Sequence, residues 1–203
     1  NAGQYLTQHL MRWNNLLSKK HELSDEKERG LWCELHILEL AVKRYGIENA
    51  LQAWVGPSGA PQDFCFENVF VEVKALLEKA GEVKISSLNQ LDAVGLLLLA
   101  LVGIEQSSVG LSLRDKVNKL KKIFSDPYAE ALFTEALLLN GYSEDLDQVG
   151  SDKRYCPSFV SWYNASVENF PSLKRSSISS AVLSAKYSLA VSSIEQFKTE
   201  GLF

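Results

Sequence analysis

The spacing of hydrophobic residues predicts helices in the N-terminal part of the chain. Apolar residues recur every three or four positions over 4–19 and again over 25–45, as they do in amphipathic helices. Ser24-Asp25, followed by Glu28, is a helix-start pattern and supports a beginning at this point. A shorter helix is expected over Ile47–Trp54. These segments predict a helical layer ahead of the first strands.

Glu34 is a polar residue on the hydrophobic side of the second predicted helix. It lies beside Leu31 and Leu38 in the apolar stripe. Burying a carboxylate there is costly unless it is paired or lies near a metal ion. Two interpretations stay open, a glutamate at the edge of the stripe that pairs with a lysine or arginine, and a functional acid.

Alternating side chains predict a β-hairpin after this helical layer. Phe64-Cys65-Phe66 and Val69–Val73 are rich in aromatic and β-branched residues, and Glu67-Asn68 can form the two-residue turn between them. This register places Asp63 opposite Glu72. One face of the hairpin is then a core face that carries Phe64, Phe66, Val69, Val71 and Val73. The other face carries Asp63, Cys65, Phe70, Glu72 and Lys74.

The rest of the chain alternates between strand and helix patterns. The expected elements are a strand over 83–85, a helix beginning at the capping-box pattern 87–90, a buried strand over Val94–Glu105, an amphipathic helix over 111–124, a helix over 126–139, a turn-rich region over 142–175 and a final strand over 179–191. This order of elements predicts an α/β or α+β core, and we take α/β as the fold class.

Composition and charge are those of an ordinary globular protein. The chain has 203 residues, 46% hydrophobic and 23% charged, which suits a single domain with a sizeable core. The formal net charge of −4 argues against a general nucleic-acid coat protein, although a local surface can differ in charge from the whole chain. Basic residues gather in two places, Lys174-Arg175 and a predicted solvent-facing helix surface with Arg114, Lys116, Lys119, Lys121 and Lys122.

Cysteine usage and hydropathy favour a cytoplasmic location. Cys33, Cys65 and Cys156 are odd in number and lack metal-ligand spacing, which is typical of a reducing compartment. The most apolar run, Gly95–Ile104, is too short to span a bilayer. We therefore expect no membrane association.

Asp63, Glu72 and Lys74 form the main candidate site. Two carboxylates directly opposite each other on a hairpin repel unless positive charge lies between them. Lys74 supplies part of that charge, and a divalent cation would supply the rest. The competing interpretation is an ordinary hairpin with a solvated charged face. A slip of one residue would move Asp63 to the opposite face and remove the site.

Several stretches together resemble the PD-(D/E)XK nuclease superfamily, and more narrowly a bacterial branch with a G-L-x-G-E-L helix. The helix reads Arg29-Gly-Leu-Trp-Cys-Glu-Leu35, with Cys33 where the branch has glycine. In place of the Pro-Asp dipeptide the chain has Gln62-Asp63. The other stretches that carry the resemblance are 53–64, 71–74, 85–91, 170–173 and 185–189.

The resemblance implies a restriction endonuclease-like core, with a mixed central β-sheet flanked by α-helices and extra C-terminal helices. It implies one nuclease-like domain over 1–203. Within it, 20–105 would form the catalytic core, and 106–203 would add a helical extension and a closing strand.

The resemblance also implies Mg²⁺-dependent hydrolysis of DNA, with Mn²⁺ as a substitute, in a restriction or phage-defence setting. Asp63, Glu72 and Glu34 would bind the metal, and Lys74 would orient the attacking water or stabilise the developing charge. Ser86, Ser87 and Gln90 would position phosphate or water.

Two further expectations concern partners and the loss of activity. Besides DNA, the expected partners are a second copy of the chain or another component of a defence complex. The alternative function is that of a catalytically inactive module with the same fold, which binds DNA or serves as a scaffold.

Overall fold

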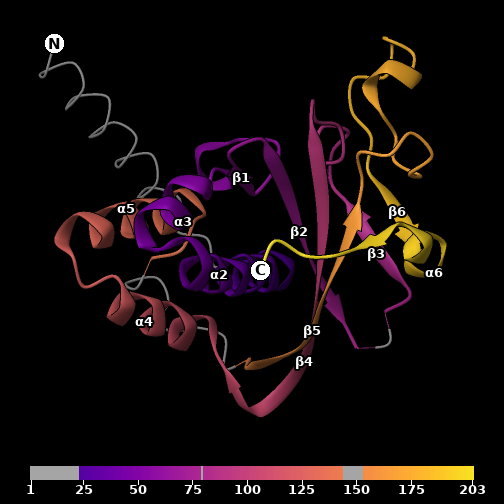
Figure 1. Ribbon diagram of the computed structural model, residues 1–203. Coiled ribbons are helices and arrows are strands. Elements are labelled where there is room, and N and C mark those ends of the chain that lie inside the picture. The colour runs from indigo at the N-terminus through magenta and orange to yellow at the C-terminus, as the bar shows by residue number, and fades with distance from the viewer. Residues whose placement is uncertain (1–22, 79, 144–152) are drawn as a thin grey trace, which may run out of the picture.

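The fold is built around one mixed β-sheet that stands between a layer of helices and a smaller second sheet (Figure 1). The computed structural model describes residues 23–78, 80–143 and 153–203, so the helix predicted over 4–19 lies outside the described residues. The main helices are α2 (Asp25–Tyr45), α3 (Ile47–Ala53), α4 (Leu113–Ile123), α5 (Pro127–Leu139) and the short α6 (Val191–Ile194). The strands are β1 (Phe64–Phe66), β2 (Val69–Leu77), β3 (Glu82–Ile85), β4 (Leu96–Leu111), β5 (Tyr155–Asn164), β6 (Tyr187–Ala190) and β7 (Lys198–Thr199).

Helix α2 forms where the sequence pattern predicts it. Ser24 is its N-cap and accepts a hydrogen bond from the backbone N–H of Lys27. Acidic residues occupy the first turn and basic residues the last turn, as the helix dipole favours. Gly46, with φ of 83°, ends the helix and leads directly into α3. The predicted helices over 25–45 and 47–54 are confirmed.

The central sheet has the strand order β1-β2-β4-β5-β7. Strands β2 and β4 are parallel, and the other neighbouring pairs are antiparallel. Strand β4 is the long apolar strand expected over Val94–Glu105, and its residues from Leu97 to Ile104 are buried. Because both faces of this strand are covered, its sequence is a continuous apolar run instead of an alternating one. The mixed sheet confirms the expected restriction endonuclease-like α/β class.

The two faces of the sheet are covered by different elements. Helices α2, α3, α4 and α5 cover one face, and their apolar residues form a core with Phe64, Val71 and Val73. The pair β3–β6 covers the other face, where Val83 and Leu189 pack against Leu97, Leu99 and Leu101 of β4. In Figure 1 the sheet is seen nearly on edge between these two layers.

Three sequence-based predictions are wrong in detail. The helix expected at Ser87–Gln90 does not form, because the Gln90 side chain bonds the backbone N–H of Ser86 and the Lys74 ammonium group instead of capping a helix. The turn-rich region 142–175 contains β5, a strand of the main sheet whose pattern Pro157 interrupts. The strand expected over 179–191 is limited to Tyr187–Ala190, where a partner, β3, is present.

Helix α4 confirms the amphipathic pattern but not the exposure of every lysine. Lys116 is only 2% exposed, and its Nζ atom lies 2.7 Å from Glu39 Oε2 of α2. The same nitrogen contacts the His36 ring at 3.3 Å and lies over the Trp32 ring. Lys119 also pairs with Glu39. The buried Lys116–Glu39 ion pair therefore joins α4 to α2 at a position where an apolar contact would be usual.

The described helices include none that is long and apolar enough to cross a membrane. Cys33, Cys65 and Cys156 are free thiols.

Candidate active site

The β1–β2 hairpin has the predicted register. Phe64 pairs with Val71 and Phe66 with Val69, and the backbone N–H of Asp63 donates to the Val71 carbonyl at 3.0 Å. The next hydrogen bond to β2 comes from the Asp63 side chain, whose Oδ2 accepts from the Val73 N–H at 2.7 Å. Asp63 is therefore held beside Glu72, immediately before β1 begins.

The turn before Asp63 is also fitted closely to it. The Asp63 carbonyl accepts hydrogen bonds from the N–H groups of Val55 and Gly56. A Cβ atom at Gly56 would lie 3.0 Å from Asp63 Cα and 3.2 Å from its Oδ1. A larger residue at position 56 would crowd Asp63, so the turn confines Asp63 from the other side.

Glu72 is a buried carboxylate with incomplete pairing. Its residue surface is 1% exposed, and Lys74 Nζ lies 2.7 Å from Oε1, although the angles there are not those of a hydrogen bond. Oε2 is buried without a hydrogen-bond partner. Burial and the Asp63 charge hold the pKa of Glu72 well above its usual range, against the opposing effect of Lys74. A buried carboxylate oxygen without a partner fits a position where a cation binds.

Asp63 and Glu34 complete an acidic group around Lys74. Burial raises the pKa of Asp63 to about 6, against the hydrogen bond from the Val73 N–H. Burial, and after it the Asp63 charge, raise the pKa of Glu34 to about 8. Trp54 Nε1 donates to Glu34 Oε2 at 2.9 Å and so holds the carboxylate in place. The structure thus brings the four predicted acid and lysine residues into one electrostatic group.

Of Ser86, Ser87 and Gln90, only Gln90 contacts the acidic group through its side chain. Gln90 Oε1 accepts from Lys74 Nζ at 3.1 Å and from the Ser86 N–H at 2.7 Å, so Gln90 positions the lysine. Ser86 takes part through its backbone. Within the described residues, neither the Ser86 nor the Ser87 hydroxyl forms a hydrogen bond.

Two residues of this site have roles that the sequence pattern did not reveal. Gln62 is buried, and its Nε2 donates to the backbone oxygens of Asn89 at 2.7 Å and Gln90 at 3.3 Å. Trp54 holds Glu34. Both contacts join segments more than fifteen residues apart in the sequence, and no local periodicity signals such a contact. Gln62 replaces the proline of the family motif with a side chain that clamps the loop carrying Gln90.

The donor set suits a hard divalent cation in part. No group of three or more His, Cys, Asp or Glu side chains within the described residues stands ready as a complete metal site. Mg²⁺, however, is commonly held by one or two carboxylates, with waters and substrate phosphate oxygens as the other ligands. Asp63 and Glu72 meet that requirement, since the unpartnered Glu72 Oε2 is available.

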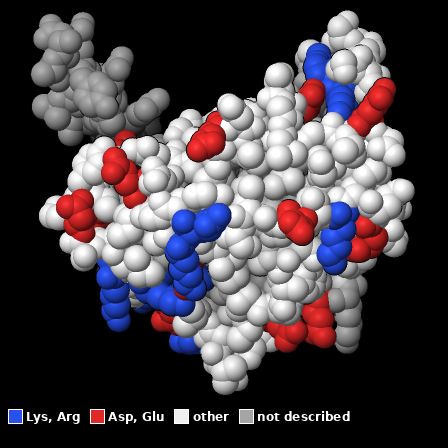
Figure 2. All heavy atoms as spheres, in the orientation of Figure 1, with Lys and Arg blue, Asp and Glu red and all other residues white. Residues whose placement is uncertain are grey.

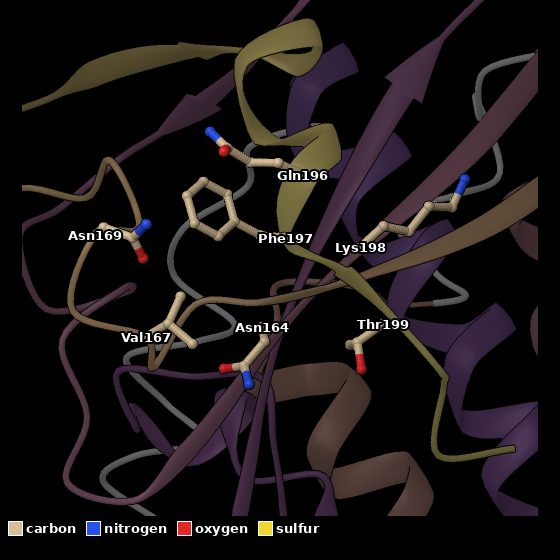
Figure 3. Close-up of a pocket in the computed structure, with 7 residues that line it drawn as sticks. All are labelled: Asn164, Val167, Asn169, Gln196, Phe197, Lys198 and Thr199. Carbon is tan, nitrogen blue, oxygen red and sulfur yellow. The ribbon is translucent and has the colours of Figure 1, made fainter.

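The surface also has an open hollow, whose lining side chains are shown in Figure 3. It has a volume of about 390 Å³ and is lined by Asn164, Val167, Asn169, Gln196, Phe197, Lys198 and Thr199. None of the acidic group lines it. The chemistry of Asp63, Glu72 and Lys74, and not the size of this hollow, identifies the candidate active site.

A mixed sheet whose hairpin brings together an aspartate, a glutamate and a lysine is the arrangement of the PD-(D/E)XK, or restriction endonuclease-like, class of proteins. The sequence model of the family described as "Putative PD-(D/E)XK family member, (DUF4420)" matches residues 2–192. The chain belongs to this family. No curated protein and no solved structure matches it.

Proposed function

We propose that the protein hydrolyses phosphodiester bonds of DNA with the help of a divalent metal ion, Mg²⁺ in the cell and Mn²⁺ as a substitute. The observation that carries this proposal is the position of Lys74 Nζ beside the buried Glu72 carboxylate, with Asp63 fixed next to it. Membership of a nuclease-like family supports the reaction class.

In this proposal each side chain has a distinct task. Asp63 and Glu72 hold the metal ion, and Glu34 lies close enough for its charge to act on both. The metal would neutralise charge on the scissile phosphate and make a nearby water a stronger nucleophile. Lys74 donates hydrogen bonds to the phosphate oxygen that gains negative charge as the bond to the leaving oxygen breaks. Gln90 orients Lys74, and Trp54 orients Glu34.

The proposed location and biological role of the enzyme rest on the family resemblance and not on the geometry of the site. We place the enzyme in the cytoplasm, in restriction or phage defence, where three free cysteines would stay reduced. Cutting both strands would suit a second copy of the chain or a complex partner.

Incubation of the purified protein with supercoiled plasmid, with and without Mg²⁺ or Mn²⁺, tests the function. We expect nicked or linear product only with metal, and none from Asp63→Asn. Intact plasmid with both metals, together with intact linear and single-stranded DNA, would contradict the proposal and favour an inactive module of the same fold.

Replacing Gln90 with alanine is expected to lower kcat about 10-fold to 100-fold, because Lys74 loses the oxygen that orients it and small misplacements in a site are costly. KM for DNA should change little, since Gln90 is not proposed to bind substrate. Steady-state cleavage of a labelled duplex measures both constants. Asn89→Ala is the matched control, since it keeps the backbone oxygen that Gln62 uses. Equal kcat values for the two variants would show that Gln90 does not position the lysine.

A further inference from the structure

The chain segment 171–186, here called the basic arm, stands out from the body of the protein between β5 and β6 (Figure 1, upper right). It contains Lys174, Arg175 and Lys186, six serines and no aspartate or glutamate. Most of its residues are exposed. Figure 2 shows basic side chains at this place, and the acidic ones beside them belong to other segments.

The basic arm is attached to the loop that serves the candidate active site. The backbone N–H of Arg175 donates to Asp92 Oδ2 at 2.8 Å, and the N–H of Leu173 donates to the Tyr187 hydroxyl at 3.3 Å. Asp92 lies two residues after Gln90, which contacts Lys74. Through Asp92, the arm is therefore connected to the loop whose Gln90 side chain contacts Lys74.

The arm is shaped by its own polar groups. The Arg175 guanidinium group donates to the Val182 carbonyl. Ser177 Oγ donates to the Lys174 carbonyl at 2.8 Å, and Ser179 Oγ accepts from the Ala181 N–H at 3.3 Å. Arg175 and these serines therefore link the backbone of the arm to itself.

The two lysines of the arm carry charge that the protein does not neutralise. Neither Lys174 nor Lys186 forms an ion pair within the described residues. By contrast, three lysines of α2 and α4 share one carboxylate, Glu39. Since the whole chain has a net charge of −4, attraction of a polyanion has to come from a local surface of this kind.

We propose that the basic arm binds the sugar-phosphate backbone of double-stranded DNA beside the scissile bond. This inference rests on the proposed function, and it assigns a surface to the substrate outside the acidic group. Lysine ammonium groups and serine hydroxyls are common partners of phosphate oxygens, and they fix a duplex in position without reading its sequence. The arm should therefore contribute affinity that depends strongly on salt and weakly on sequence.

The test removes the two free charges and keeps Arg175, which shapes the arm. Lys174→Ala with Lys186→Ala is compared with Lys27→Ala with Lys122→Ala, a control that removes two exposed lysines on α2 and α4. Fluorescence anisotropy without metal measures binding to a labelled duplex of about 25 base pairs over a range of salt concentrations. We expect the arm variant to bind about 10-fold more weakly and to reduce the salt slope by about 2, with the control close to the unmodified protein.

The outcomes separate this inference from the proposed function. Unchanged affinity and slope in the arm variant, an equal loss in the control, or no duplex binding by the unmodified protein would overturn the inference. Hydrolysis of bis(p-nitrophenyl) phosphate with Mn²⁺ reports on the acidic group alone, because so small a diester does not reach the arm. The arm variant should keep this activity, and an equal thermal midpoint in all proteins shows that folding is unchanged.

Discussion

Replacing Lys74 with alanine is expected to lower the rate of DNA cleavage about 10³-fold. Lys74 Nζ lies 2.7 Å from Glu72 Oε1 and 3.1 Å from Gln90 Oε1. In the proposed reaction, these contacts hold it where negative charge develops on the phosphate. Alanine removes the only proposed donor for that charge and leaves the Glu72 carboxylate without its lysine. Single-turnover cleavage of a labelled duplex with saturating Mg²⁺ measures the effect.

The control for this experiment is the same change at a neighbouring strand. Lys84 is exposed on β3, and Lys84→Ala removes an equal charge without touching the acidic group. We expect it to keep the cleavage rate of the unmodified protein. Cleavage by Lys74→Ala within about 10-fold of the Lys84→Ala rate would rule out the role given to Lys74.

Replacing Glu39 with glutamine is expected to lower the free energy of unfolding by about 3 kcal/mol. Lys116 is 2% exposed and would be left in the protein interior without a carboxylate beside its ammonium group. Restoring an apolar contact should recover most of the loss, so Glu39→Leu with Lys116→Met is expected to be far more stable than Glu39→Gln. Urea unfolding of both variants measures this, and equal stabilities would contradict the account.

The same ion pairs predict a dependence of stability on pH. Burial acts to raise the pKa of Glu39, but hydrogen bonds from Lys116 and Lys119 outweigh it and lower this pKa to about 2. A carboxyl whose folded pKa is depressed stabilises the protein above its unfolded pKa, and that stabilisation is lost as pH falls toward the folded pKa. The unmodified protein should therefore lose stability between about pH 4.5 and pH 2, and Glu39→Gln should lack this part of the loss.

The elements that the sequence predicts well are those whose pattern is local. The Ser24 cap, the stripe of α2 and the β1–β2 register depend on residues close together in the chain, and the structure agrees with each. Strand β5 escapes prediction, because its place beside β4 comes from pairing with residues more than forty positions away. The 86–92 loop escapes it for a related reason, since Gln90 bonds Lys74 across the fold.

The candidate site divides in the same way. Strand alternation and the sequence motif predict Asp63, Glu72 and Lys74 as site residues. The position of Glu34 on an apolar helix stripe predicts the fourth. Trp54 and Gln62, which hold Glu34 and the Gln90 loop, carry no such signal. Their roles depend on which distant segments the fold brings together.

The proposed function requires that Asp63 and Glu72 together bind a divalent cation. Anomalous diffraction from a crystal soaked in Mn²⁺ tests it most directly. We predict a peak about 2.0–2.2 Å from carboxylate oxygens of both residues, with Glu34 nearby, and its loss in Asp63→Asn. Full Mn²⁺ occupancy elsewhere on the protein with no peak between Asp63 and Glu72 would contradict the proposed site.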